Sequence, residues 1–283
     1  MEVIVSNIHI VIDSTAHAGS EFISQHENLH VVPLKLFLGD KEYNENEITN
    51  EELFTKVKET KVFPKTSQPP LGEFVNLFTE LTAAGNKIIV ITVAAGLSGT
   101  IQGATNAANM VNKKDIKVID SGTTAVGILR LAEKAVDMVE RGLEFEEIIE
   151  KLEQCAKATK TVVITNTLEY LHKGGRIGGA SALFGTIMQI KPIMKLSEGK
   201  VTVIDKVRTR SKSISRMVEE LSQHKGFDHI GIAHITAYDE ALALQEKLQE
   251  IYPNTKITVT TGGAVLASHL GPGVLALIYQ EEI

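Results

Sequence analysis

The sequence predicts an α/β protein of two domains: an N-terminal α/β/α domain with a parallel sheet, and a C-terminal α/β domain with a mixed sheet. Short apolar runs alternate with helical patterns along the first half of the chain, as in parallel sheets covered by helices on both faces. A second unit begins near residue 160 and contains a hairpin pattern. The 283 residues, 43% of them hydrophobic, are enough for two cores.

In the first unit, three buried strands are predicted, each followed by a helical segment, at residues 8–13, 87–93 and 116–121. Residues 30–43 alternate in polarity around Gly39-Asp40 and are expected to form an extended strand or a hairpin. Residues 122–157 are predicted to be helical, with Gly142 as a break between two helices.

Two helix starts are marked in this unit. Thr49 stands three residues before Glu52, which is the spacing of a capping box. Thr66 and Ser67 are expected at or just before a second helix, whose first turn tolerates the prolines that follow them.

The second unit should begin with a strand at 161–165 and continue with a short helix, a glycine-rich turn and another helix within 168–190. Residues 190–207 are predicted to form a hairpin with Glu198-Gly199 as its turn. Helices and strands then alternate to the end. No Gly/Ser linker separates the units, so we expect domains 1–159 and 160–283 in close contact.

Composition excludes several classes of function. A net charge of −6 argues against a nucleic-acid surface, which needs clustered basic side chains. Cys155 is the single cysteine and is expected to be a small buried side chain on an amphipathic helix. The N-terminus has no basic region before its apolar run, and no stretch approaches the roughly 20 apolar residues of a spanning helix. We expect a cytoplasmic protein.

Four polar clusters interrupt the apolar pattern: "KTSQP" (65–69), "GLSGT" (96–100), "KGGRIGG" (173–179) and "SHLGPG" (268–273). The second follows a predicted parallel strand and precedes a helix, where backbone N–H groups can bind a carboxylate or phosphate. Its Ser98 is either an additional donor or simply an N-cap. Thr66 offers the same pair of alternatives.

The other two clusters also leave alternatives open. His269 lies in a tight turn region and is either structural or, near a carboxylate, a donor with a raised pKa. The segment "KGGRIGG", with Arg176, is an anion-binding loop, a partner surface or a mobile connection. Asp13 and Asp120 end predicted strands and are expected to cap helices and close loops, with binding of a metal or a base as the alternative. No metal-ligand spacing, nucleophile motif or nucleotide loop is present in the sequence.

Taken together, the chain resembles the DegV family of bacterial fatty-acid-binding proteins over essentially its full length. The elements that carry the resemblance, in order, are "IVIDST" (10–15), "KTSQP" (65–69), "LSGT" (97–100), "VIDS" (118–121), "YLHKGGRI" (170–177) and "HLGPG" (269–273). Each is weak alone, but their joint order and spacing are specific. Ala94-Ala95 replace the serines common before "LSGT" in the family, which removes only secondary hydroxyls.

The resemblance implies a DegV-like fold with a long-chain fatty acid, such as palmitate, stearate or oleate, held between the two domains. It implies that Thr66, Ser98 and His269 bind the carboxylate, with Ser67, Gly99 and Thr100 as backbone or secondary contacts. The acyl chain would enter an apolar tunnel in the second domain. Leu183, Phe184, Ile187, Met188 and Ile190 are candidates for its lining, with ordinary core as the alternative.

The resemblance also implies a partner. Some members carry the lipid for a separate ATP-binding fatty acid kinase subunit, whose acyl-phosphate product enters phospholipid synthesis. Arg208, with Arg210 as its competitor, matches the arginine that works with the kinase, and Arg176 is a second candidate for a phosphate or partner contact. We expect no catalytic residue, cofactor or metal, no nucleic acid and no integral membrane segment; transient membrane contact stays open. The alternatives are a lipid-sensing regulatory protein and a stand-alone phosphotransferase or hydrolase.

Overall fold

A four-stranded parallel sheet organises the N-terminal part of the chain. The computed structural model describes residues 7–185, 190–197 and 199–283. The sheet has the strand order β2-β1-β6-β7, and its strands are β1 (Ile8–Asp13), β2 (Leu29–Val32), β6 (Lys87–Thr92) and β7 (Ile116–Asp120). Neighbouring strands are parallel throughout. The three strands predicted in this unit are therefore confirmed, and β2 is added from the alternating segment.

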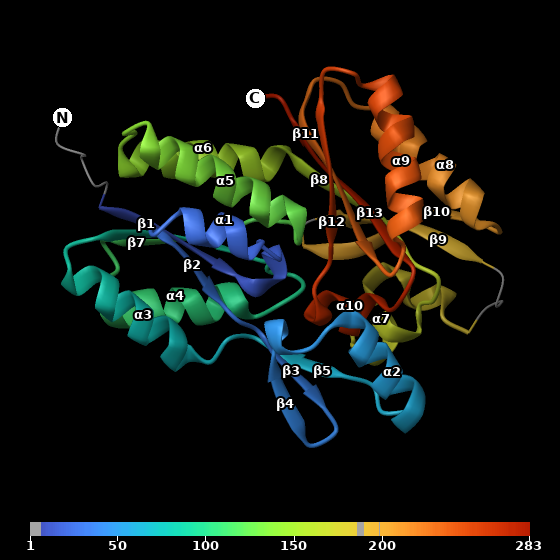
Figure 1. The fold of residues 1–283 in the computed structure, drawn as a ribbon, viewed down its shortest axis with the longest axis horizontal. Helices are drawn as coiled ribbons and strands as arrows, with labels where there is room; N and C mark the ends of the chain where they lie inside the picture. Colours follow the sequence, from blue (N-terminus) through green and yellow to red (C-terminus); the bar gives the residue numbers. More distant parts are fainter. Residues whose placement is uncertain (1–6, 186–189, 198) are drawn as a thin grey trace.

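Helices cover both faces of this sheet, as predicted (Figure 1). On one face lie α1 (Ser20–Gln25), α5 (Val126–Glu140) and α6 (Phe145–Ala158), and on the other lie α3 (Leu71–Ala83) and α4 (Thr100–Val111). Gly142, with φ +76°, ends α5 where the sequence predicted the break. Thr49 caps α2 (Asn50–Thr60) and forms the predicted capping box with Glu52.

A six-stranded mixed sheet organises the C-terminal part, in the order β10-β9-β8-β13-β11-β12. Its strands are β8 (Thr159–Ile164), β9 (Lys191–Ser197), β10 (Lys200–Val207), β11 (Phe227–Ile235), β12 (Lys256–Thr261) and β13 (Val274–Glu281). Only β11 and β12 pair in parallel; the other neighbours are antiparallel. Helices α8 (Arg210–Ser222) and α9 (Tyr238–Ile251) cover one face (Figure 1). The predicted hairpin is β9–β10; Glu198 lies outside the described residues.

Strands β3 (Lys35–Leu38) and β4 (Lys41–Asn44) form the hairpin predicted around Gly39-Asp40, and β5 (Lys65–Ser67), which was not predicted, completes a small antiparallel sheet. Its Leu36 shares a hydrophobic cluster with Leu53 of α2 and with the inner face of the six-stranded sheet. Helix α10 (Ala264–Leu270) lies beside α2 and this small sheet (Figure 1). The segment from 35 to 67 thus packs on the C-terminal part of the chain. The domain boundary at 159/160 stays a prediction.

The prediction of an α-helix after the glycine-rich turn was wrong for the residues that the structure describes there. Residues Gly178–Leu183 form a 3-10 helix, η3, and Gly178 and Gly185 both have positive φ. Glycines in that conformation interrupt an α-helix. The shorter α7 (Glu169–Lys173) precedes it, as expected.

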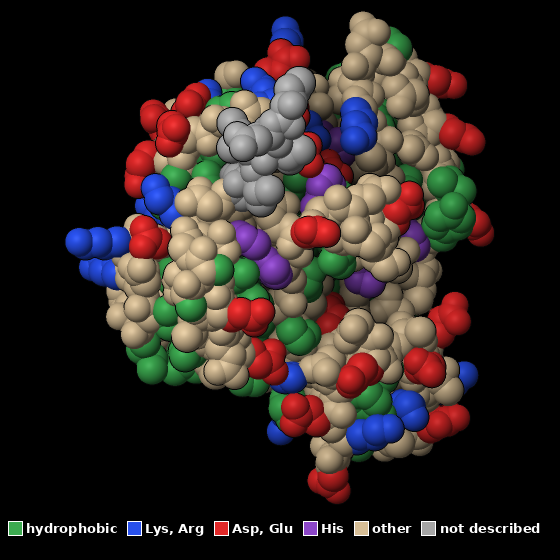
Figure 2. Space-filling model, turned by 60° about the vertical axis from the view of Figure 1, so that its left-hand side comes forward, with side chains coloured by type: hydrophobic (Ala, Val, Ile, Leu, Met, Phe, Trp, Pro, Cys, Tyr) green, Lys and Arg blue, Asp and Glu red, His purple; other side chains and the backbone are tan. Residues whose placement is uncertain are grey.

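Acidic and basic side chains are interspersed over the face drawn in Figure 2, with histidines between them. This agrees with the mild net charge of −6. The described side chains on that face do not form the broad basic surface that nucleic acids require.

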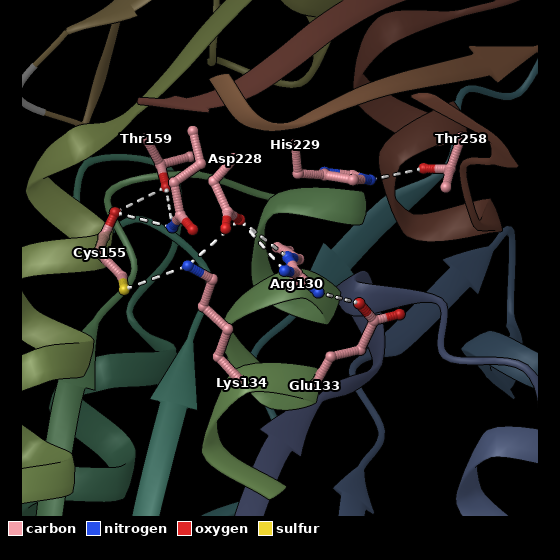
Figure 3. Close-up of polar contacts among 9 residues, drawn as sticks. Arg130, Glu133, Lys134, Cys155, Thr159, Asp228, His229 and Thr258 are labelled. Carbon is pink, nitrogen blue, oxygen red and sulfur yellow. Dashed lines mark hydrogen bonds and ion pairs between the residues drawn. The ribbon is translucent and has the colours of Figure 1, made fainter. Parts of the chain in front are cut away.

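A polar network, which we call the Arg130–Asp228 brace, joins helix α5 to strand β11 of the six-stranded sheet. Arg130 and Lys134 of α5 both contact Asp228 at the start of β11, at 3.1 and 3.2 Å (Figure 3). Lys134 Nζ also lies 3.8 Å from the Sγ of Cys155 on α6. Cys155 is 3% exposed, which confirms its predicted burial.

Candidate functional site

The loop after β6 is held in place by two aspartates at the ends of neighbouring strands. Asp13 accepts hydrogen bonds from the backbone N–H groups of Thr15 and Val93, and Asp120 accepts one from Ala95 at 3.1 Å. Both aspartates therefore close loops, as the sequence predicted. Burial raises the pKa of Asp13, against the opposing effect of these hydrogen bonds.

Gly96 in this loop meets the β9–β10 hairpin turn. A Cβ placed on Gly96 would lie 2.1 Å from the carbonyl oxygen of Gly199. No side chain fits at that distance, so glycine is required where the two parts of the chain touch. The small residues before Ser98 thus have a packing reason of their own.

Ser98 is not the N-cap of α4. The helix begins at Thr100 with Gly99 as its cap, and the cap makes no side-chain hydrogen bond. Ser98 Oγ instead accepts the N–H of Thr100 at 3.3 Å and lies 2.8 Å from Thr100 Oγ1. Thr100 is buried and supports Ser98, and it is not among the residues that line the cavity described below.

Thr66 and Ser67 were expected beside a helix start, and this expectation was wrong. Both lie on β5, where Thr66 pairs with Leu36 of β3, and α3 begins only at Leu71. These residues are extended because they pair with β3, and the two prolines that follow separate them from the helix. A helix-capping role for Thr66 is therefore excluded.

Thr66 and His269, 203 residues apart, are joined by a hydrogen bond of 2.6 Å between Oγ1 and Nε2. Burial, with a smaller contribution from the charge of Arg176, lowers the pKa of His269 to about 4. His269 is therefore neutral at pH 7, whereas a raised pKa was expected only beside a carboxylate. The Nδ1 atom packs on Gly174, where a Cβ would approach it to 2.3 Å.

Arg176 connects the glycine-rich segment to the loop after β6. Its Nε donates to the carbonyl oxygen of Leu97 at 3.1 Å and its Nη1 to that of Gly174 at 2.8 Å. These contacts fix the side chain, which argues against a mobile connection. Within the described part of the chain, Arg176 has no carboxylate partner, and its Nη2 makes no hydrogen bond.

These residues meet at one cavity of about 450 Å³, a size in the range of small-molecule sites. Thr66, Ser98, Arg176 and His269 line it together, and we call these four residues the polar end. Ser67 and Gly99 also line the cavity. The sequence missed Gln68, which lines it as well and packs over Gly99.

The rest of the lining is mostly apolar and comes from two elements the sequence did not single out. The six-stranded sheet contributes Val163, Ala276 and Ile278, and α10 contributes Val265, Leu266 and Leu270. Period-two alternation along β8 and β13 was the available signal, because it places these residues on one face.

The candidates proposed as tunnel lining do not line this cavity where they are described. Phe184 is 39% exposed and stacks on His172 at 3.7 Å between ring centroids. Leu183 and Ile190 are not among the lining residues. Ile187 and Met188 lie outside the described residues. The predicted helix is absent from the described part, so its apolar face does not form there.

Arg208 and Arg210 differ in their surroundings. Arg210 forms an ion pair with Glu240 at 2.7 Å. Arg208 is exposed and makes no hydrogen bond or ion pair within residues 7–185, 190–197 and 199–283. Neither residue lines the cavity.

No helix among the described residues is long and apolar enough to cross a membrane. In the same part of the chain, no group of three or more histidine, cysteine, aspartate or glutamate side chains could hold a metal ion.

Comparisons with known proteins agree with this architecture. A family model described as "Uncharacterised protein, DegV family" matches residues 7–282. "Protein DegV" of Bacillus subtilis is 33% identical over 278 residues, which cover 96% of this chain and 99% of that protein.

Two solved structures are similar over nearly the whole chain. One is described as "Fatty Acid Binding of a DegV family Protein from Thermus thermophilus", with a TM-score of 0.89, 29% identity, and coverage of 97% of this chain and 99% of that one. The other is described as DegV, a fatty acid binding protein from Bacillus subtilis, with a TM-score of 0.87, 32% identity, and coverage of 98% and 100%.

Proposed function

The chain belongs to the DegV family, and on this premise we propose that it binds a long-chain fatty acid such as palmitate, stearate or oleate. The carboxylate lies at the polar end, and the acyl chain lies along the apolar lining from the six-stranded sheet and α10. The observation that carries this proposal is one cavity with four convergent polar side chains at Thr66, Ser98, Arg176 and His269 and a mostly apolar remainder. Two similar structures are described as fatty-acid-binding proteins.

The energetics of such a ligand fit the lining. Burial of each methylene contributes about 0.8 kcal/mol, so the acyl chain supplies most of the affinity. A carboxylate taken out of water needs several donors. The hydroxyl groups of Thr66 and Ser98 and the guanidinium of Arg176 provide them, so the polar end fixes the orientation of the ligand.

His269 has an indirect role in this proposal. Its Nε2 is already engaged by Thr66 at 2.6 Å. When Nε2 carries the proton, it donates to Thr66 Oγ1 and leaves the threonine proton for the carboxylate. His269 then orients Thr66, and a direct contact with the ligand is not required.

We further propose that the chain has no catalytic activity alone and presents the carboxylate to a separate ATP-binding kinase subunit for acyl-phosphate formation. The exposed Arg208 supports this assignment, because it is free of the ion pair that holds Arg210. ATP turnover by the purified chain would contradict it. Acyl-phosphate that forms only when both proteins are present would support it. Domains 1–159 and 160–283 and a cytoplasmic location stay predictions.

The direct test of the binding proposal is mass spectrometry of lipid extracted from the purified protein. We expect a long-chain fatty acid in near-equimolar amount. After delipidation, calorimetry should show tight binding of palmitate and weaker binding of hexadecanol, which has the same chain without the carboxylate. No extracted fatty acid and no binding after delipidation would contradict the proposal.

A further inference from the structure

Glu45 is a buried carboxyl group outside the polar end. It begins the 3-10 helix η2 (Glu45–Glu47) and is 4% exposed. Its side chain accepts a hydrogen bond from Ser14 Oγ and another from the backbone N–H of Val265 at 3.1 Å. Among the described residues it has no cationic partner. A buried carboxylate without a cation is costly, and a protonated carboxyl group is not.

The hydrogen bonds around Glu45 hold together three segments that line the cavity. The N–H of Leu34 donates to Ser14 Oγ at 2.9 Å, and the N–H of Glu45 donates to the carbonyl oxygen of Leu34 at 3.2 Å. Glu45 thereby links the end of β1, the connection between β2 and β3, and the start of α10. Thr15, Leu34 and Val265, one from each segment, all line the cavity.

This junction has little room to rearrange while it stays closed. A Cβ on Gly263 would lie 2.2 Å from Glu45 Oε1 and 3.0 Å from His17 Nδ1. Asn50 Nδ2 also donates to the carbonyl oxygen of Gly262 at 2.8 Å. The same short helix, α10, carries His269 at its far end. A displacement at Val265 therefore reaches both the apolar lining and the polar end.

We propose that Glu45 is a positioning residue that closes this side of the cavity when it is protonated and releases it when it is ionised. Proton uptake then holds the ligand, and proton loss favours its release. The closing of this side of the cavity depends on contacts within the chain and requires no ligand. The step that involves a ligand rests on the proposed function.

The direction of the effect follows from the environment of Glu45. Burial, with a smaller contribution from Asp13, raises the pKa of Glu45 from 4.5 to about 7, against the hydrogen bonds from Ser14 and Val265. An opening that brings Glu45 into water returns its pKa towards 4.5. Closure is thus fully favoured below 4.5 and loses this contribution as pH rises through about 7. Opening should increase about tenfold between pH 6 and pH 8.

Other titratable groups surround this junction. They are Asp13 from β1, His17 from the 3-10 turn after it, and Lys35 and Glu47 from the adjoining hairpin segment. The α10 side contributes none between Gly262 and Leu266. These groups are unchanged in a Glu45 variant, so a comparison of variant and wild type isolates Glu45.

Hydrogen exchange of the ligand-free protein tests the closing step. Glu45→Gln keeps the size and the acceptor but cannot ionise. The matched control is Glu47→Gln, two residues along, at an exposed position where glutamine also suits the capping box. We expect the ratio of wild-type to Glu45→Gln exchange in residues 264–270 to rise about tenfold from pH 6 to pH 8. Glu47→Gln should follow the wild type.

A ratio that does not change with pH would overturn the proposal, because a purely structural role for Glu45 predicts a constant ratio. If Glu45→Gln fails to fold, infrared titration of the wild type decides. In the wild type, a protonated carboxyl band should disappear as pH rises through about 7. The same band should disappear at the same pH in Glu47→Gln. Absence of that band in the wild type would also overturn the proposal.

Release of palmitate to serum albumin tests the ligand step. Release from the wild type should accelerate from pH 6 to pH 8, relative to Glu45→Gln. Equal pH dependence in both proteins would overturn this step. Failure of the wild type to bind palmitate at all would instead refute the proposed function, while the exchange experiment would still decide the closing step.

Discussion

The Arg130–Asp228 brace and the polar end of the cavity both bring cations into half-buried positions, but among the described residues only the brace includes an anion. In the brace, Asp228 lies between Arg130 and Lys134 (Figure 3). At the polar end, the donors of Arg176 meet two backbone carbonyl oxygens and no carboxylate among the residues that the structure describes. The difference shows which cluster is complete in the folded chain. The brace is satisfied by its own residues, whereas the described neighbours of the polar end leave donors for an external anion.

The pKa values support the same distinction. Burial alone would raise the pKa of Asp228, but the charges of Lys134 and Arg130 hold it below its usual value. At the polar end, burial and Arg176 lower the pKa of His269 to about 4, so His269 adds no second charge beside the arginine at neutral pH. A carboxylate ligand would supply the negative charge that Asp228 supplies in the brace.

The largest expected effect comes from removal of both hydroxyl groups at the polar end. Thr66→Val with Ser98→Ala removes two donors to a charged group, each contributing about 1.5–3 kcal/mol. We expect palmitate affinity to fall by about a hundredfold or more, as measured by calorimetry on delipidated protein, with hexadecanol affected less.

Ser67→Ala is the matched control for this pair. Ser67 lines the same cavity, but its hydroxyl donates to the carbonyl oxygen of Gln68 at 3.1 Å. Its loss should change palmitate affinity little. If the control weakens binding as much as the double variant does, the assignment of the carboxylate to Thr66 and Ser98 is wrong.

A smaller effect, and on stability only, is expected from Asp228→Asn. The side chain is 31% exposed, so solvent screens the network and its contribution is about 1 kcal/mol. The melting temperature should fall by about 2–4 °C, with palmitate affinity per folded molecule unchanged.

The pH dependence of this stability effect has a defined sign. The pKa of Asp228 is lowered in the folded state from 3.8, so its contribution is present above 3.8 and is lost as pH falls through the lower folded value. Wild type and variant should therefore converge under acid conditions in thermal unfolding. A variant with normal stability but weakened palmitate binding would erase the distinction between the two clusters.

The sequence predicted much of the fold because local signals determine it. Apolar runs located β1, β6 and β7, Gly142 located the break between α5 and α6, and Thr49 located the start of α2. The β3–β4 hairpin was predicted, but its pairing with β5 was not, because that pairing joins residues about 30 positions apart. Thr66 lies on a strand and not at a helix start because of this long-range pairing, which no local sequence signal indicates.

Much of the site depended on the family resemblance. The motifs singled out Thr66, Ser98 and His269, and all three line one cavity; their binding of a carboxylate stays a prediction. Residues alone could not show that His269 would bond Thr66, since 203 positions separate them. The apolar lining predicted at Leu183, Phe184 and Ile190 does not face the cavity, since the described residues Gly178–Leu183 form a 3-10 helix and not the expected α-helix.

The central claim is that the polar end binds the carboxylate of a fatty acid beside Arg176. NMR titration of palmitate labelled with ¹³C at its carboxyl group tests it most directly, in the wild type, in Arg176→Gln and in Arg208→Gln as a control outside the cavity. We predict that the bound carboxyl group titrates at a lower pH in the wild type and in Arg208→Gln than in Arg176→Gln, because a neighbouring cation favours the ionised form. Identical titration midpoints in the wild type and Arg176→Gln would place the carboxylate elsewhere and contradict the account.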